Sequence, residues 1–267
     1  MSIKIDGVSA ATLGFKVMID TEEPILPSTV DRTLAIPGRR GVYDFGSDVS
    51  FRLFEISCAI LKSGVQLQTT LSNIAKALTD NEGNPKWVEL TFDSDPLKVF
   101  EVRYMGNLRI NRMSNISTFK LPLMAREPYS RFKYNATSFN LQDYDITLDA
   151  ADFPLGSAYT YTITNAQNVA INNFGDISIY PLVQITGTFS TFTLSANGKT
   201  LTYSQAISNQ TLNIDNEKMQ IYISTTNKLN QSSGDFVHLI PGNNSLTLGG
   251  TGLNCSVSFI FKPKHIS

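Results

Sequence analysis

The sequence predicts a mostly β protein in two parts: an N-terminal α+β module, in which a β-sheet or barrel carries one helix, and a C-terminal β-sandwich of jelly-roll or related type. Three observations lead to this prediction. One segment has a clear helical period, many short runs alternate between apolar and polar residues, and the composition changes near residue 134. We therefore expect two domains, over residues 1–134 and 135–267.

Composition and charge argue against several functional classes. The 267 residues are 42% hydrophobic and 17% charged, which is enough apolar material for one large or two ordinary domains. A net charge of -1 argues against a protein that grips nucleic-acid phosphates. No run approaches the roughly 18 apolar residues of a membrane span, and the N-terminus has no signal-peptide core. We expect no membrane insertion and folding in the cytoplasm of the cell that makes the protein.

The change in composition divides the chain sharply. All nine arginines precede residue 134, where they and eight lysines face fifteen acidic residues. Residues 135–267 have five lysines, eight acidic residues and many Ser, Thr and Asn. This asymmetry indicates a charged module followed by a weakly charged β module, joined within residues 128–135.

The first notable element is a Pro-Gly turn between two strand-like runs, within residues 32–46. Pro37 presets φ for the second position of a type II turn, and Gly38 supplies the positive φ needed at the third. Arg39 and Arg40 are then held at a rigid tip. Taken alone, this pattern is equally typical of a solvated hairpin loop.

The rest of the N-terminal module has strands on both sides of one helix. A strand is expected over 49–61, a helix over 66–79 and another strand over 87–92, and the loop at 80–85 ends the helix. The apolar positions of the helix fall on one face: Leu67, Leu71, Ile74, Ala75 and Leu78. Two later runs have period-2 faces and are expected to pair antiparallel; these faces are Phe100, Val102 and Tyr104, and Phe119, Leu121 and Leu123.

The C-terminal module is read almost entirely as strands and turns. Asn197-Gly198 between alternating runs predicts a hairpin over residues 189–203. Further strands are expected over 159–164, 177–186, 211–214, 219–224, 236–240, 245–248 and 255–261. The Gly-rich stretch 249–252 is read as a hairpin loop, because no helix follows it to meet a phosphate.

No residue pattern in the chain predicts catalysis, a cofactor or a metal. His238 and His265 lack a plausible partner set, and Asp93 and Asp95 are typical of a surface turn between strands rather than an acid/base pair. Cys58 and Cys255 lie in apolar runs and are expected to be buried free thiols. We therefore expect a non-enzymatic protein.

The order of these segments resembles the distal tail protein (Dit) family of long-tailed, siphovirus-type phages. The segments that carry the resemblance are 32–41, 49–61, the helix, 90–96 and 119–128 in the first half, and 173–181, the Asn-Gly-Lys hairpin and 239–244 in the second. Each is a weak pattern alone. Their shared order extends over most of the chain.

The resemblance implies a virion protein of the tail tip, made in the cytoplasm of the bacterial host. Members form a homo-hexameric hub ring built by the N-terminal domain, while a galectin-like C-terminal domain projects outward. The ring joins the tail tube protein to the tail-tip or tail-associated lysin protein and to receptor-binding proteins, and DNA passes through without specific binding. On this basis we expect a subunit interface at Arg32, Pro37, Gly38, Arg39, Arg40 and Gly41.

A carbohydrate-binding or host-surface adhesion module is the alternative. Sugar sites usually present an exposed aromatic ring, Trp above all, and residues 135–267 contain no Trp. Tyr161, Tyr180 and Tyr222 lie inside strand-like runs and are expected to pack, whereas Tyr144 and Tyr159 near loop tips are the candidate exposed rings.

Overall fold

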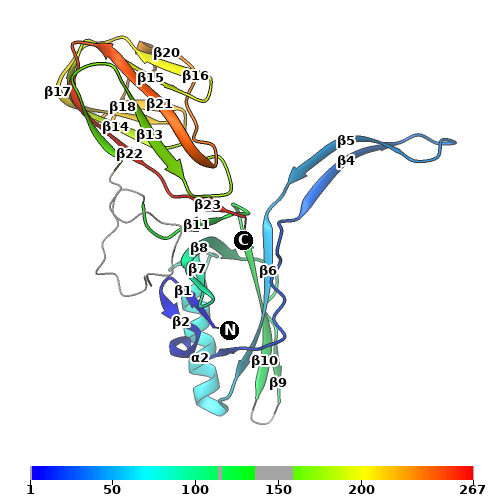
Figure 1. Ribbon diagram of the computed structural model, residues 1–267. Coiled ribbons are helices and arrows are strands. Elements are labelled where there is room, and N and C mark those ends of the chain that lie inside the picture. Colours follow the sequence, from blue (N-terminus) through cyan, green and yellow to red (C-terminus); the bar gives the residue numbers. More distant parts are fainter. Residues whose placement is uncertain (1, 114–115, 136–158, 267) are drawn as a thin grey trace. The chain divides into compact units, whose positions relative to one another are not determined.

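The computed structural model describes residues 2–113, 116–135 and 159–266 (Figure 1). The chain forms two compact units, Met1–Arg131 with Ile266–Ser267, and Phe132–His265. The assignment of residues 1–134 and 135–267 to separate domains remains a prediction.

A twisted antiparallel sheet forms the body of the first unit. Its strands lie in the order β2 (Val8–Ser9), β1 (Ile3–Ile5), β7 (Trp87–Phe92), β8 (Asp95–Tyr104), β10 (Ser117–Ala125), β6 (Arg52–Ile60) and β3 (Lys16–Val17). In addition, β9 (Ile110–Arg112) pairs with β10, and β11 (Ser130–Phe132) pairs with β8. The predicted antiparallel pairing of β8 and β10 is confirmed, with Leu123 opposite Tyr104.

Alternation along the strands builds the core of this unit. Every second residue of β6 and β10 is buried, including Phe54, Ile56, Leu121 and Leu123, and the ring of Phe54 lies 5.0 Å from that of Phe100. Helix α2 (Gly64–Leu78) confirms the expected helix. It adds Leu67, Ile74 and Leu78 to the same cluster, whereas Ala75, expected on that face, is exposed. Each fully buried aliphatic or aromatic side chain stabilises the fold by about 1.5–3 kcal/mol.

Local hydrogen bonds fix the helix ends. The predicted stop is confirmed at the loop after α2, where Asp80 accepts hydrogen bonds from the backbone N–H groups of Glu82 and Asn84 at 2.9 and 2.8 Å. The short helix α1 (Ala10–Leu13) is capped by Ser9, whose hydroxyl accepts from the N–H of Thr12.

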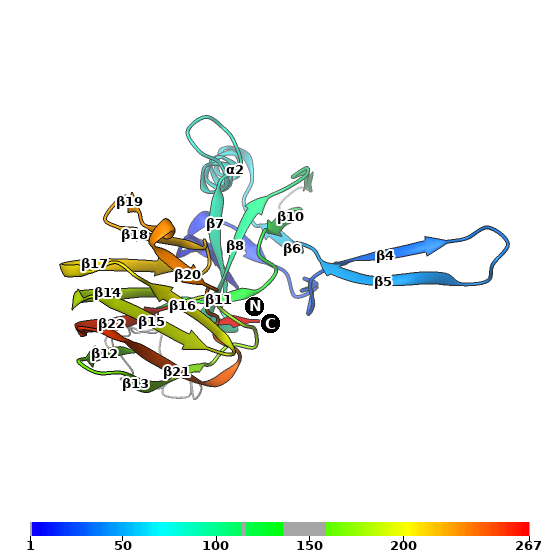
Figure 2. The same ribbon diagram turned by 90° about the horizontal axis from the view of Figure 1, so that it is seen from above.

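Two further strands of the first unit stand apart from its sheet. β4 (Thr29–Ala35) and β5 (Val42–Val49) form a separate two-stranded ribbon, which we call the arm (residues 29–49). In both views the arm extends away from the sheet of the first unit (Figures 1 and 2). The single strand expected over 49–61 is therefore divided at Ser50–Phe51, where β5 of the arm leads into β6 of the sheet.

The second unit is a β-sandwich, as predicted. One sheet has the order β12 (Thr160–Ile163), β22 (Asn254–Ile260), β14 (Leu182–Phe189), β17 (Ile207–Asp215), β18 (Gln220–Ile223) and β19 (Thr226–Asn227). The other has β13 (Gln167–Asn173), β21 (Gly242–Thr251), β15 (Thr191–Ala196), β16 (Lys199–Tyr203) and β20 (Ser232–Gly234). A short 3-10 helix, η1 (Leu229–Gln231), precedes β20, and β23 (Lys264–His265) follows β22.

The core of the sandwich combines the inward faces of both sheets. Ile185, Phe259, Leu194 and Leu248 are all fully buried in one cluster. The predicted Asn-Gly hairpin is confirmed: Asn197 and Gly198 have φ of 48° and 77° and join β15 to β16.

Several predictions for the second half were wrong in detail. The strand expected over 177–186 begins only at Leu182. Residues 236–240 form only an isolated bridge, Ile179 to Leu239, because buried Asn216 and Asn244 take backbone groups there that a strand would use. The segment 249–252 is not simply a loop, since Gly249, Gly250 and Thr251 continue β21 and pair with β15. Two strands, β13 and β20, were not predicted.

Candidate functional site

The tip of the arm is the type II turn that the sequence predicts. The N–H of Arg39 donates to the carbonyl of Ile36 at 3.1 Å, and Gly38 has φ of 83°. Pro37 and Gly38 therefore occupy the second and third positions of the turn. Gly41, with φ of 86°, leads back into β5. The turn is stiff because Pro37 fixes φ at the second position and Gly38 adopts the positive φ that the third position needs.

The two arginines at the tip differ in their surroundings. The guanidinium of Arg39 lies 4.1 Å from the ring centroid of Tyr43, a cation–π contact that draws the side chain back onto β5. Arg40 is exposed. Arg39 is exposed as well, and its contact with Tyr43 sets the direction of its side chain at the tip.

Arg32 lies away from the turn, on β4. It forms an ion pair with Asp48 across the ribbon. Next to this pair the register shifts between Asp31 and Thr33, so that Phe45 and Gly46 together oppose Arg32 in a β-bulge. Gly46 takes the positive φ of 90° that the bulge needs, and its N–H donates to the Asp44 carboxylate at 2.8 Å. The structure thus brings the five tip residues together and leaves Arg32 apart from them.

One face of the arm carries four large apolar side chains together with the Arg32–Asp48 ion pair. Leu34 is directly opposite Tyr43, and strand alternation places Val30 on the same face as Leu34 and Phe45 on the same face as Tyr43. We call these four residues the apolar face of the arm. Phe45 is 67% and Leu34 51% exposed, although such residues are usually buried. The arm therefore exposes apolar residues on a ribbon that has no core of its own.

Sequence reasoning identified the turn but missed this apolar face. The sequence contains this alternation: Val30, Arg32 and Leu34 occupy every second position of one run, and Tyr43 and Phe45 do so in the other. Alternation shows that residues share a face, but it does not show whether that face meets the core of the same chain. An isolated two-stranded ribbon is marginally stable in water, so an exposed apolar face on one is typical of a surface that is covered by a partner.

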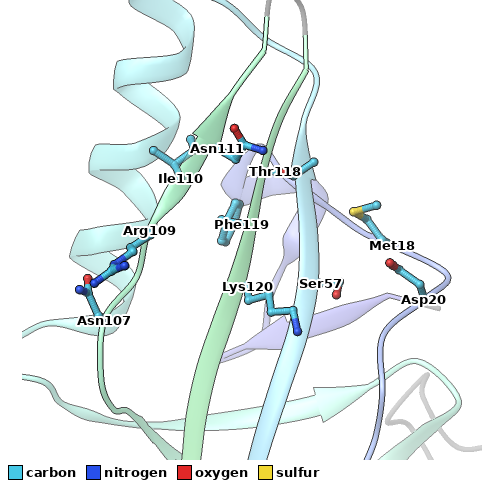
Figure 3. A pocket seen from close by; sticks show the side chains of 10 residues that line it. All are labelled: Met18, Asp20, Ser57, Asn107, Arg109, Ile110, Asn111, Thr118, Phe119 and Lys120. Atoms are coloured by element: carbon cyan, nitrogen blue, oxygen red, sulfur yellow. The ribbon is translucent and has the colours of Figure 1, made fainter.

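One hollow of the first unit has no catalytic arrangement. An open groove of about 610 Å³ lies beside β9 and β10 (Figure 3). Asp20 is the one carboxylate among its lining residues, and the lining contains no His or Cys. Lys120, which also lines it, pairs with Glu55 at 3.4 Å. The groove offers neither an acid/base pair nor a set of metal ligands.

Asp95 and His265, two other candidate groups, are held in structural contacts. Asp95 at the β7–β8 turn pairs with Lys98 at 3.0 Å, and Nδ1 of His265 lies 3.5 Å from the carboxylate of Asp176. Among the described residues, no group of three or more His, Cys, Asp or Glu could hold a metal ion. In the same part of the chain, no helix has the length and apolar character that crossing a membrane requires.

The tyrosines that are exposed and buried in the structure differ from those expected to be so. Tyr159, a candidate exposed ring, is buried and stacks on Phe261 at 5.6 Å, and Tyr144 lies outside the described residues. Tyr180, expected to pack, is 42% exposed, and its ring lies 5.9 Å from that of His238. Among the described residues of the second unit, Tyr180 is the exposed tyrosine, and His238 beside it is partly exposed.

Both cysteines are buried free thiols, as predicted. Burial raises the pKa of Cys58 to about 12 and raises that of Cys255 as well. With a pKa near 12, about one Cys58 in ten thousand is a thiolate at pH 8, and the thiolate is the reactive form. We expect no reaction with a chromogenic disulfide reagent within an hour in the folded protein, and two reactive thiols in guanidinium. One rapidly reacting thiol in the folded state would contradict this burial.

Comparison with known proteins gives consistent matches for both halves. A family profile described as a phage tail protein RIFT-related domain matches residues 9–125, and one described as a siphovirus-type tail component, C-terminal domain, matches residues 174–265. No curated protein matches the chain in sequence.

Solved structures with a similar fold are also known. The chain is similar to the crystal structure of the Dit protein of phage SPP1, described as a paradigm of the hub adsorption apparatus in phages that infect Gram-positive bacteria. Identity is 14%, the TM-score is 0.68, and 98% of each chain is covered. A chain of the phage P2 baseplate in its activated conformation with Ca matches with 10% identity and a TM-score of 0.45, over 98% of this chain and 97% of that one.

Proposed function

The chain belongs to the siphovirus-type distal tail (Dit) protein family, a family of structural tail proteins, and from this premise we propose that it forms a homo-hexameric hub ring at the distal end of the tail tube. It is a phage tail component, and its place is the tip of the virion tail. The single observation that best supports the ring is the arm, whose apolar face is exposed in the subunit.

A ring needs contacts between unlike surfaces of neighbouring subunits. Such heterologous contacts close when each subunit reaches the next through the same rotation. The arm extends from the sheet of its own unit, so it is suited to reach a neighbouring copy (Figure 2). Burying Leu34, Phe45 and Val30 against that copy would stabilise the contact by about 1.5–3 kcal/mol for each side chain. The number six comes from the family, not from the shape of the arm.

The proposed partners follow from the same family membership. We place the tail tube protein on one side of the ring, the tail-tip or tail-associated lysin protein on the other, and receptor-binding proteins at the rim. Residues 1–134 would build the ring and residues 135–267 would carry the outer contacts. The net charge of -1 suits a conduit for DNA, since a strongly basic lumen would hold the passing phosphates. Assembly would take place in the cytoplasm of the bacterial host, and we assign the chain no catalytic activity.

Electron microscopy of the purified chain in negative stain tests the ring directly. We expect sixfold rings with an open centre, and sedimentation equilibrium should give six times the mass of 29.5 kDa. A chain that stays monomeric up to high micromolar concentration, both alone and mixed with its tail tube protein, would refute the ring. Antibody labelling of intact tails should mark the distal tip alone.

A substitution at the tip of the arm should have a smaller effect on ring association. Replacing Arg40 by Glu is expected to weaken ring association about twofold to tenfold, because a rim charge contributes modestly and is screened by salt. The matched control is Lys218→Glu, at an exposed position of the second unit, which should leave association unchanged. The measurement is the ring-to-monomer ratio by sedimentation velocity at 50 and 300 mM salt. Equal association of wild type and Arg40→Glu at both salts would remove Arg40 from the interface.

One observation favours a second candidate function, sugar binding by the second unit. Tyr180 presents an exposed ring beside His238, and an aromatic face is the usual stacking surface for a sugar. Binding of the full chain to a glycan array that is lost in Tyr180→Ala would support this role. An array without signal, together with normal rings, would leave the hub as the function.

A further inference from the structure

Arg52 is a buried arginine at the base of the arm. It is the first residue of β6, where the chain returns from the arm into the sheet, and it is 1% exposed. Arginine is almost never fully buried unless its charge is compensated, so its environment calls for an explanation.

The guanidinium of Arg52 joins segments that are far apart in sequence. Its Nη2 group donates to the carbonyl of Ile25, which lies on the incoming side of the arm, and to the carbonyl of Ile266 at 2.9 Å. The Cζ atom of the guanidinium also lies 5.3 Å from the ring centroid of Phe100 on β8. One side chain thus connects both legs of the arm to the sheet and to the segment at Ile266.

Glu23 provides part of the charge compensation. Burial raises the pKa of Glu23, and the nearby positive charge of Arg52 opposes that rise. Burial lowers the pKa of Arg52, and Glu23 and Tyr129 oppose that change. A guanidinium keeps its proton in proteins, so Arg52 is charged, and hydrogen bonds from a charged donor are roughly twice as strong as neutral ones.

Other contacts at the base hold the two legs to each other but do little to fix their direction. The N–H of Ser50 donates to the carbonyl of Ser28 at 2.8 Å, and the hydroxyl of Ser28 donates to the carbonyl of Phe51 at 2.7 Å. Such bonds would move with the ribbon if it pivoted. An isolated bridge between Glu22 and Glu55 connects the incoming leg to β6 further from the arm.

We propose that Arg52 is the positioning residue of the arm: by holding the Ile25 and Ile266 carbonyls against β6 it fixes the direction in which the arm leaves the first unit. The segment at Ile266 is then part of the mount of the arm. The consequence for assembly rests on the proposed ring, since a neighbouring copy can bind only an arm that points toward it. The direction of the arm in a single subunit does not depend on that function.

Distance measurement between spin labels tests the direction in the absence of a ring. Labels are attached to cysteines introduced at Thr33 on the arm and at Val65 on α2, both exposed positions of the first unit. The native cysteines are buried and should not be labelled. The measurement uses the Leu34→Asp/Phe45→Asp background, designed to stay monomeric, so that ring formation does not affect the distances.

We expect one narrow distance distribution with Arg52 present. Arg52→Met should at least double its width, and a chain lacking residues 266 and 267 should also broaden it, because each change removes a carbonyl contact. Arg52→Lys keeps the charge but loses the planar guanidinium that lies over Phe100 and has a shorter side chain, so it should give an intermediate width. The control Arg126→Met removes an exposed arginine that pairs with Glu101 at 2.9 Å and should leave the width unchanged.

The outcomes separate this inference from the proposed function. An unchanged width in folded Arg52→Met would overturn the positioning role. If Arg52→Met does not fold, unchanged widths in Arg52→Lys and in the chain lacking residues 266 and 267 would overturn it. Broadening in these variants, together with a wild type that forms no rings, would support the positioning role and refute the ring.

Discussion

Replacing Leu34 and Phe45 together by aspartate is expected to abolish ring formation while leaving the subunit folded. Both side chains belong to the apolar face of the arm and are exposed in the subunit, so their loss removes little from its own stability. In a ring, each carboxylate would be buried against apolar surface without a partner. Substitution at an interface position of this kind weakens the binding free energy by about 2 kcal/mol or more. This corresponds to a roughly thirtyfold loss of affinity at each of six contacts.

The measurement is sedimentation velocity at a concentration where the wild type forms rings. The double variant should run as a monomer with an unfolding midpoint close to that of the wild type. Met219→Asp is the matched control, because it adds a carboxylate at an exposed apolar position in a turn of the second unit. Rings of normal abundance from the double variant would show that the apolar face of the arm is not the subunit contact.

Gly250→Ala is expected to cause a large loss of stability in the second unit. Gly250 lies in β21 with φ of 138°, and a Cβ atom there would lie 2.1 Å from the carbonyl oxygen of Thr191 on the paired strand β15. Neither backbone can move without breaking the ladder between the two strands. Overpacking and a strained φ together should cost about 3 kcal/mol or more.

The neighbouring glycine provides the control. A Cβ at Gly249 would meet only the Cβ of Ala166, at 3.8 Å, which is an ordinary contact, so Gly249→Ala should change stability by less than about 1 kcal/mol. Denaturation followed by circular dichroism reports both units, and fluorescence of Trp87, the single tryptophan, reports the first unit alone. Equal midpoints for the two variants would contradict the close approach of β21 and β15.

The regular elements could be predicted because their patterns are local. Helix α2 follows from one apolar face, the β15–β16 hairpin from Asn197-Gly198 and β10 from the alternation of Phe119, Leu121 and Leu123. The type II turn at Pro37 and Gly38 follows from the φ preferences of two residues. In each case, neighbours within a few positions supply the physical cause.

The errors arose where distant residues decide the backbone. Residues 236–240 have the apolar alternation of a strand, yet the side chain of Asn216 accepts from the N–H of Val237 and that of Asn244 accepts from the N–H of Ile240, at 2.9 Å in each case. The glycines at 249 and 250 look like a loop, but a partner strand holds them in β21. Asn216 and strand β15 lie far away in sequence, so the contacts that they make leave no local signal. Asn244 is four residues from Ile240, but apolar alternation does not reveal a side chain that bonds the backbone.

By itself the sequence determined the mostly β class, the single long helix, the change of character near residue 134 and the stiff turn at Pro37 and Gly38. Only the tertiary structure decided that the strands around that turn leave the sheet as an arm, that Leu34 and Phe45 are exposed rather than buried, and that Arg52 is buried at its base. The reason is physical. Periodicity and turn propensity act between neighbours in sequence, whereas burial depends on which distant segments pack against a face.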